Sequence, residues 1–241
     1  MANFFVDRDG FWCDPVEIYG EEANHMIKVL RMKVGEKLTL FDGDGNCVDG
    51  EIEKIENKMV FVKVLNRYAS ESEPKLKITL FQAIPKNPKM DLIVQKATEL
   101  GVNMIKPVNT KRIVAKIDKE DKIARLNRIA FEAAKQCGRA YVPPVSAPIS
   151  FDEAIELMKD YDAAIIPYEC EKDGKLASAL PKGIKNLAII IGPEGGFDEA
   201  EVKKTIEAGI KPVTLGKRIL RTETAGLIAS ALCLYIAGDM D

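Results

Sequence analysis

The sequence predicts an α/β protein in two parts, a small β-rich domain followed by a larger domain built on a mostly parallel sheet. Three observations predict this fold class. Short apolar runs separated by turns fill the first ~70 residues, the polar stretch 69–74 ends in a proline, and from residue 75 onward strand-like runs alternate with helical patterns. We therefore expect one domain over 1–72 and a second over 73–241.

The first domain is expected to be a small barrel. Its glycine-bearing segment Asp42–Asn46 is typical of a tight turn between two strands, and one helix is expected over Glu21–Leu30. Several short strands in so few residues favour a closed or half-closed barrel. The predicted strands are Phe4–Val6, Lys37–Phe41, Cys47–Ile55 and Met59–Val64.

The second domain is expected to alternate strands with helices. In its first helix, Asn87 is the expected N-cap, Pro88 the first helical residue and Gly101 the left-handed terminator. The next helix is expected over Glu120–Cys137, with a buried apolar stripe of Ile123, Leu126, Ala130, Ala133 and Cys137. The predicted strands are Ile78–Ala83, Ala163–Ile166, Leu187–Ile191 and Val213–Leu215.

The scarcity of metal-ligating side chains excludes several classes of protein. The chain has one histidine, His25, and five cysteines without a C-x-x-C pair, so a serine–histidine triad, a zinc site and a disulfide framework are not expected. The longest apolar stretch, Ala225–Ala237, is too short to span a bilayer, and the first residues do not resemble a secretory signal. We expect a cytoplasmic protein with no metal and no membrane partner.

Charge is distributed unevenly along the chain. The net charge of −2 is not typical of a protein that binds nucleic acid. However, residues 1–74 carry −6, residues 75–147 carry +9 and residues 148–241 carry −5. The basic central third predicts a localised surface that faces anions.

The helix in that basic third carries a stripe of cations. Arg125, Arg128 and Lys135 fall within one sector of it, and Arg139 joins them if the helix extends that far. The stripe could bind phosphates, or it could be an ordinary solvated face, and the sequence leaves both interpretations open.

A glycine-rich loop at Gly192–Gly196 is the sharpest local feature. Ile189–Ile191 before it is typical of a strand buried on both faces, and Asp198 with Glu201 after it forms a capping-box pattern for a helix. Open α/β sheets bind ligands in such loops, at the carboxyl ends of strands. The loop matches neither the dinucleotide fingerprint nor the P-loop, and an ordinary tight connection is the alternative.

A second glycine-bearing turn lies at Leu215–Ala225. It is expected to follow a strand and to precede the last helix, for which Thr222 is the candidate N-cap. That helix is apolar nearly all round, so we expect it to be buried on all sides, in part at a subunit interface. Arg218, Arg221 and Glu223 could be surface charges at a helix end, but their place beside a glycine turn favours a functional role.

Together these segments resemble one family, the ribosomal RNA small-subunit methyltransferase E (RsmE) family, whose members methylate N3 of a uridine in 16S ribosomal RNA. The resemblance covers nearly the whole chain. Its most specific motifs are Ile191–Phe197 and Leu215–Ala225 in combination. The other motifs are His25 with Val29–Arg31, Lys96–Val102 and Glu132–Arg139.

The resemblance implies a fold and a cofactor. The second domain would be a SPOUT-type methyltransferase domain with a trefoil knot near its C-terminus, and the first a PUA-like barrel that docks RNA. The donor, S-adenosylmethionine, would sit where the two glycine-bearing turns converge, so that Gly195 and Leu220 share one cavity. The implied cofactor-binding residues are Ile166, Pro167, Gly192, Pro193, Glu194, Gly195, Gly196, Leu215, Gly216, Ile219, Leu220, Arg221, Thr224 and Ala225.

The resemblance also implies partners and catalytic residues. Arg221 would stabilise negative charge on the uracil oxygens, and Glu194 or Glu223 is a candidate base that could instead order a loop. The partners would be 16S ribosomal RNA or the small ribosomal subunit, and a second copy of the chain to form a homodimer. The expected RNA-binding residues are Arg8, His25, Arg31, Lys86, Lys89, Arg112, Arg125, Arg128, Lys135, Gln136 and Arg139.

Two other functions fit the same residues. A ribosome-assembly protein could bind RNA on this fold without catalysis, and it would then neither bind nor use a methyl donor. A small-molecule α/β enzyme with a nucleotide-type cofactor is the second alternative. The separate β domain and the basic central third argue against that enzyme.

Overall fold

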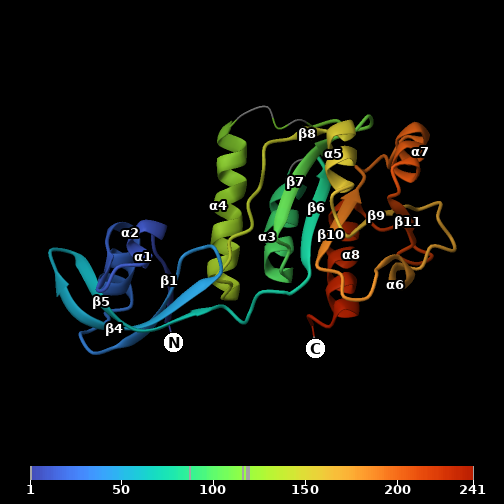
Figure 1. Ribbon diagram of the computed structural model, residues 1–241. Helices are drawn as coiled ribbons and strands as arrows, with labels where there is room; N and C mark the ends of the chain where they lie inside the picture. Colours follow the sequence, from blue (N-terminus) through green and yellow to red (C-terminus); the bar gives the residue numbers. More distant parts are fainter. Residues whose placement is uncertain (1, 87, 116, 118–119, 241) are drawn as a thin grey trace. The chain divides into compact units, whose positions relative to one another are not determined.

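The computed structural model describes residues 2–86, 88–115, 117 and 120–240 (Figure 1). The chain divides into two compact units. The first comprises the residues up to Glu73 together with Ala134–Val142, and the second comprises Pro74–Ala133 together with the residues from Pro143 onward. The division after Glu73 lies one residue beyond the predicted boundary, and the prediction had placed 134–142 in the larger domain.

The first unit contains one five-stranded sheet in the order β1-β3-β4-β5-β2. β1 pairs with β3 in parallel, and the other pairs are antiparallel. The predicted strands and the predicted helix are confirmed in place, whereas β2 and α1 were not predicted because each is only three or four residues long. The elements are β1 Ala2–Phe5, α1 Arg8–Phe11, β2 Val16–Ile18, α2 Gly20–Asn24, the π-helical turn η1 His25–Val29, β3 Lys37–Phe41, β4 Asn46–Glu56 and β5 Met59–Ala69.

The core of this unit follows the period of two expected for strands that bury one face. Leu38 and Leu40 in β3 are fully buried, as are Val60 and Val62 in β5. These side chains pack in one cluster with residues of the short helices, including Phe11. Burial of a large side chain of this kind stabilises the fold by about 1.5–3 kcal/mol.

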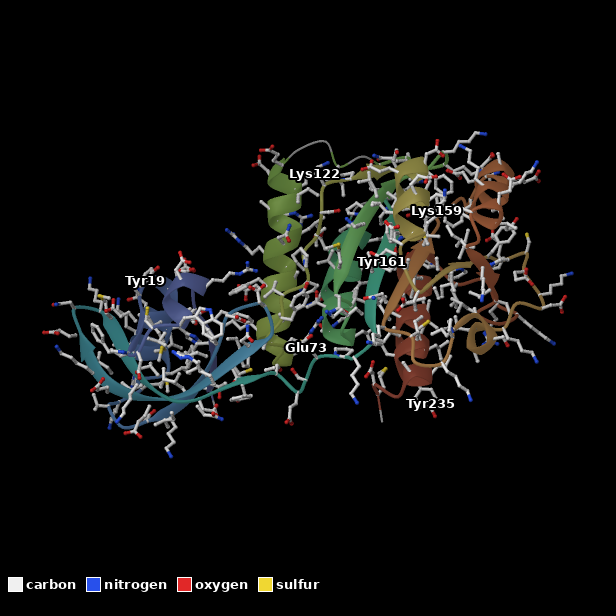
Figure 2. The ribbon with its side chains drawn as sticks, viewed as in Figure 1. Tyr19, Glu73, Lys122, Lys159, Tyr161 and Tyr235 are labelled. Atoms are coloured by element: carbon white, nitrogen blue, oxygen red, sulfur yellow. The ribbon has the colours of Figure 1, made fainter. Side chains whose placement is uncertain are left out.

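Arg139 belongs to this core and not to a basic surface stripe. The helix α4, Glu120–Cys137, ends two residues before it, and Arg139 is 4% exposed. Its Nη2 lies 2.7 Å from Oε2 of Glu73, and Oε1 of the same carboxylate accepts from the backbone N–H of Tyr141 at 3.3 Å. Lys135 is also paired within the unit, with Glu22. The prediction that these two cations line an RNA-facing stripe is therefore wrong for Arg139, because its guanidinium is buried. Its partner Glu73 is labelled in Figure 2.

The second unit is built on a six-stranded sheet in the order β11-β9-β10-β6-β7-β8, in which every pair is parallel. The predicted alternation is confirmed, with β7 and β8 as strands that were not predicted. The strands are β6 Lys77–Ala83, β7 Met104–Asn109, β8 Ile149–Ser150, β9 Ala163–Pro167, β10 Asn186–Ile191 and β11 Lys211–Val213. The helices are α3 Lys89–Leu100, α4, α5 Phe151–Met158, α6 Leu176–Ala179, α7 Glu199–Glu207 and α8 Thr222–Ala237.

Helices cover both faces of this sheet, so most side chains of its central strands are buried on both sides. Ile189, Ile190 and Ile191 are each at most 2% exposed, as the isoleucine run predicted. Ile190 packs with residues of α5 and α7. The Ile191 side chain lies against Gly226 of α8, and α8 in turn packs on α3 (Figure 1).

Several local predictions differ from the structure. Pro88 is the N-cap of α3 and not its first helical residue, and Asn87 lies outside the described residues. Cys137 is exposed, because it sits in the last turn of α4, where the buried stripe of Leu126, Ala130 and Ala133 has ended. Gly101 ends α3 with φ +98°, as predicted. The trefoil knot stays a prediction.

Replacing Arg139 with methionine is expected to destabilise the first unit, because the Glu73 carboxylate would stay largely buried without its cation. We expect the free energy of unfolding to fall by about 3 kcal/mol. Trp12, the only tryptophan of the chain, lies in this unit, so its fluorescence in a urea titration reports the change. Arg128→Met, at an exposed position of α4, is the matched control, with an expected change below about 0.5 kcal/mol. Equal losses in the two variants would contradict the assignment.

Candidate functional site

The candidate site lies at the carboxyl ends of the central parallel strands of the second unit. β9 leads into Pro167–Glu169, β10 leads into Gly192–Gly196, and β6 ends at Ala83 beside them in the strand order. Parallel strands all end at the same edge of a sheet, so three loops distant in sequence meet there.

A cavity of about 100 Å³ lies between the loop after β9 and the turn after β11. It contains Leu220, as predicted, but Gly195 does not line it. Of the predicted cofactor residues, Ile166 is fully buried behind the site. Those that line the cavity are Pro167, Leu215, Gly216, Ile219, Leu220 and Ala225. Further lining residues that were not in the predicted set are Tyr168, Glu169, Thr214, Lys217 and Arg218.

The two glycine-bearing turns are nevertheless in direct contact. The hydroxyl of Thr222 donates to the carbonyl oxygen of Gly192 at 2.6 Å. The prediction of Thr222 as N-cap is wrong, because Arg221 is the N-cap residue, with φ −67° and ψ 153°, and Thr222 is the first helical residue of α8. Its hydroxyl is therefore available to join the turns, which a capping hydroxyl would not be.

The glycine loop is held from its far end by a helix cap and by the loop after β7. Asp198 and Glu201 form the predicted capping box at the start of α7. Nη1 of Arg112 donates to the carbonyl oxygen of Gly195 at 3.0 Å. Gly196 has φ +67°, which favours glycine, and a Cβ there would displace the carboxylate of Glu169, whose Oε1 would lie 2.7 Å away.

Lys89 joins the two turns through their carboxylates. Its Nζ lies 3.2 Å from Oε1 of Glu194 and 3.0 Å from Oε2 of Glu223. The backbone N–H of Lys86 also donates to Glu194 at 3.1 Å. Lys89 is therefore engaged within the site, although the sequence suggested that it contacts RNA.

The pKa values of both carboxylates lie below their ordinary value. Burial acts to raise the pKa of Glu194 and of Glu223, but backbone hydrogen bonds and the Lys89 ammonium outweigh it. For Glu223 the charge of Arg221 adds to this effect. A carboxylate with a lowered pKa is a weak base, so these contacts favour a role in ordering the loops over proton abstraction.

Two side chains at the cavity were poorly visible in the sequence. A hydrogen bond with the Cys170 side chain, followed by burial and the charge of Glu169, raises the pKa of Tyr168 to about 12, so its phenol keeps its proton at neutral pH. Glu169 lies beside Gly196. Their position directly after a predicted strand was the only signal that could have singled them out.

The expected RNA-binding residues fall into two groups. Exposed members without an ion pair among the described residues are Arg31, Lys86, Arg128 and Gln136. Members paired with a carboxylate or a carbonyl oxygen are Arg8 with Asp44, Lys89 with Glu194 and Glu223, Arg112 with Gly195, Arg125 with Asp91, Lys135 with Glu22 and Arg139 with Glu73. His25 is partly buried and packs edge-on against Phe4. Of the paired cations, Lys89, Lys135 and Arg139 are largely buried, whereas Arg8, Arg112 and Arg125 remain exposed to solvent.

The described part of the chain also bears on two other kinds of structure. No group of three or more histidine, cysteine or acidic side chains there could hold a metal ion. Among the same residues, no helix is both long and apolar enough to cross a membrane.

Comparison with known proteins assigns the chain to a family. Residues 71–234 match the model of the RNA methyltransferase domain, and residues 18–65 match that of the RNA methyltransferase PUA domain. The chain is 36% identical over 228 residues to ribosomal RNA small subunit methyltransferase E of Bacillus subtilis, covering 90% of this chain and 89% of that protein. This chain belongs to the ribosomal RNA small subunit methyltransferase E family.

Solved members of the family share the fold along the full chain. The methyltransferase E structure from Neisseria gonorrhoeae, bound to S-adenosylmethionine, has a TM-score of 0.84 at 34% identity and covers 96% of each chain. A protein from Legionella pneumophila, solved with the same cofactor, has a TM-score of 0.80 at 35% identity over 95% of each chain. These matches confirm the predicted α/β methyltransferase domain preceded by a PUA-like domain.

The Lys89 network predicts a pH dependence of stability. Because the pKa values of Glu194 and Glu223 are lowered by folding, their contribution is present above the ordinary value of 4.5 and is lost as the pH falls through the folded values. We expect Lys89→Met to be less stable than the unaltered protein at pH 7, and the difference to shrink as the pH falls below about 4.5. Urea titrations across this pH range measure it.

Lys96→Met is the matched control on the same helix, since within the described residues Lys96 pairs with the neighbouring Glu99 alone. Its effect should be smaller at pH 7. A Lys89→Met difference that stays constant down to pH 3.5 would argue against the network.

Proposed function

We propose that this chain transfers the methyl group of S-adenosylmethionine to N3 of a uridine in 16S ribosomal RNA, in the cytoplasm. One observation carries the proposal: two glycine-bearing turns meet beside a cavity at the carboxyl edge of the parallel sheet. The hydrogen bond from Thr222 to Gly192 joins these two turns. Membership of the methyltransferase E family supports the reaction class, and the relatives solved with S-adenosylmethionine support the donor.

The donor would bind between the loops after β9 and β10 and the turn 214–220. Backbone groups near Gly216 and Gly196 allow close approach to a ligand. The described cavity is smaller than the ~300–1,000 Å³ of ordinary ligand pockets. Residues 216–219 are exposed, so we expect this segment to move outward as the donor enters. Apart from Arg221, which would act on the uracil, the set proposed for the donor remains that of the sequence prediction.

Methyl transfer is an in-line displacement at a carbon activated by the sulfonium, so the main task of the protein is positioning. Uracil N3 carries a proton and becomes a good nucleophile only when that proton has left. Arg221, exposed at the N-cap of α8, would stabilise the negative charge on the uracil oxygens. Glu194 and Glu223 would hold Lys89 and the two turns in place, and the proton would leave to a group outside this pair.

The target uridine would have to be unpaired or splayed out of its helix to reach the site. Lys86 and Arg112 lie on loops at the same edge of the sheet and would contact the phosphates around it. The PUA-like unit would dock a second stretch of RNA, with Arg31 among its exposed cations. Mapping methylated nucleotides in ribosomal RNA with and without this protein tests the substrate.

Replacing Arg221 with alanine is expected to lower turnover by about 100-fold or more while the donor Kd changes by less than about threefold. The reason is that the guanidinium would act on charge that develops only in the transition state. Calorimetric titration of S-adenosylmethionine and single-turnover methylation of small subunits give the two quantities. Lys203→Ala on the exposed face of α7 is the control. Unchanged turnover in Arg221→Ala would remove this residue from the mechanism. If the unaltered protein neither binds the donor nor methylates RNA, the non-catalytic RNA-binding alternative is favoured.

The same proposal includes a homodimer formed through α8. In a single copy, one face of this helix exposes large apolar side chains, and the expected subunit interface would cover this face. Ile228 and Leu232 are each 41% exposed, and Tyr235 is 63% exposed. Tyr235 is labelled in Figure 2. A second copy covering this face would remove them from water.

Leu232→Asp is expected to convert the dimer to a monomer, because it would place a charge in an apolar interface. Size-exclusion chromatography with light scattering measures the mass directly. Ile206→Asp, at an exposed apolar position of α7, is the control and should leave the dimer intact. A monomeric unaltered protein would contradict the homodimer, and an unchanged Leu232→Asp dimer would place its interface elsewhere.

A further inference from the structure

The hydroxyl of Thr222 is the centre of a buried chain of hydrogen bonds through three segments of the site. Thr222 is 6% exposed, and Gln82 near the end of β6 is fully buried. Nε2 of Gln82 donates to Oγ1 of Thr222 at 3.0 Å, and this hydroxyl donates to the carbonyl oxygen of Gly192 at 2.6 Å. The chain therefore connects a central strand, the start of the last helix and the first residue of the glycine loop.

The neighbouring groups determine which atom donates and which atom accepts in each of these hydrogen bonds. Nε2 of Gln82 also donates to the carbonyl oxygen of Ala83 at 3.0 Å, and because a carbonyl can only accept, the amide must present its NH₂ group on this side. The hydroxyl of Thr222 then accepts from Gln82, and it gives its single proton to Gly192, which also can only accept. The three groups form a unit that is broken when the hydroxyl is removed.

On the side of α8, these hydrogen-bonded residues are closely packed. A Cβ on Gly226 would lie 3.2 Å from Oε1 of Gln82 and 3.3 Å from Cδ1 of Leu80. Within the described residues, Oε1 of Gln82 is buried without a hydrogen-bond partner. A buried amide oxygen without a partner destabilises the fold, so stability alone gives no reason for glutamine here. Departures of this kind are expected where a side chain serves a site.

We propose that Thr222 and Gln82 are positioning residues for methyl transfer. They hold the Gly192 carbonyl, and thereby the glycine loop, against the start of α8, where Arg221 precedes Thr222. Neither Thr222 nor Gln82 lines the cavity, so both act through the backbone groups that they hold. This inference rests on the proposed function and adds to it the two buried residues that set the distance between the donor loop and Arg221.

Thr222→Val tests the unit, because valine has the shape of threonine and lacks its hydroxyl. We expect the Kd for S-adenosylmethionine, measured by calorimetry, to rise about tenfold, because the donor would then have to order the glycine loop that the hydroxyl holds in the unaltered protein. Single-turnover methylation of small subunits should slow by a further factor. Thr222→Ser, which keeps the hydroxyl, should restore both quantities to within about threefold of the unaltered protein.

Gln82→Met tests whether the two hydrogen bonds of the Thr222 hydroxyl act as one unit or independently of each other. It should weaken donor binding in the same direction, and the double variant with Thr222→Val should bind no more weakly than Thr222→Val alone, since both remove the same chain. Thr205→Val is the matched control, because Thr205 is also fully buried and its hydroxyl donates to the carbonyl of Val202 inside α7. It should lower the Tm and leave the donor Kd unchanged.

A Thr222→Val protein with a lowered Tm but unchanged donor Kd and methylation rate would overturn the inference, as would fully multiplicative effects of the two substitutions. If Thr222→Val does not fold, Thr222→Ser and Gln82→Met decide: an unchanged Kd in Gln82→Met overturns the proposal. Failure of the proposed function is seen separately, as a lack of donor binding or methylation in the unaltered protein.

Discussion

The parallel arrangement of the six-stranded sheet is the constraint on which the site depends. Parallel strands deliver all their carboxyl ends to one edge, so the loops after β6, β9 and β10 meet although up to about a hundred residues separate them in the chain. Each strand must be apolar on both faces because helices cover both. The isoleucines of β10 satisfy this requirement, and they end where the glycine loop begins.

Several cations of the basic central third are paired with the protein's own carboxylates. Lys89 pairs with Glu194 and Glu223, and Arg125 pairs with Asp91. These pairs order loops and helix ends, and they leave fewer side chains free to meet phosphates than the charge of the central third suggests. A basic stretch of sequence therefore indicates an anion-binding surface only after its internal ion pairs are known.

Backbone geometry explains why glycine occupies two positions of the loop after β10. Gly196 combines a positive φ with the close approach of Glu169, and a Cβ on Gly192 would lie 3.1 Å from the ring of Phe197. Such a loop exposes backbone groups at the edge of the sheet and leaves little bulk between them and a ligand. In the proposed mechanism the chemistry belongs to the donor, and the protein supplies this shape together with one guanidinium.

The sequence by itself determined the order and type of the main elements, the capping box of α7 and the two glycine-bearing turns, because these depend on local periodicity and on residues within a few positions of each other. Its motifs also sufficed for the family. Only the tertiary structure decided which residues distant in sequence meet: Thr222 with Gly192, Lys89 with two carboxylates, and Arg139 with Glu73. The physical reason is that each of these contacts joins residues more than 25 positions apart, and no local pattern records which distant partner a polar side chain will find.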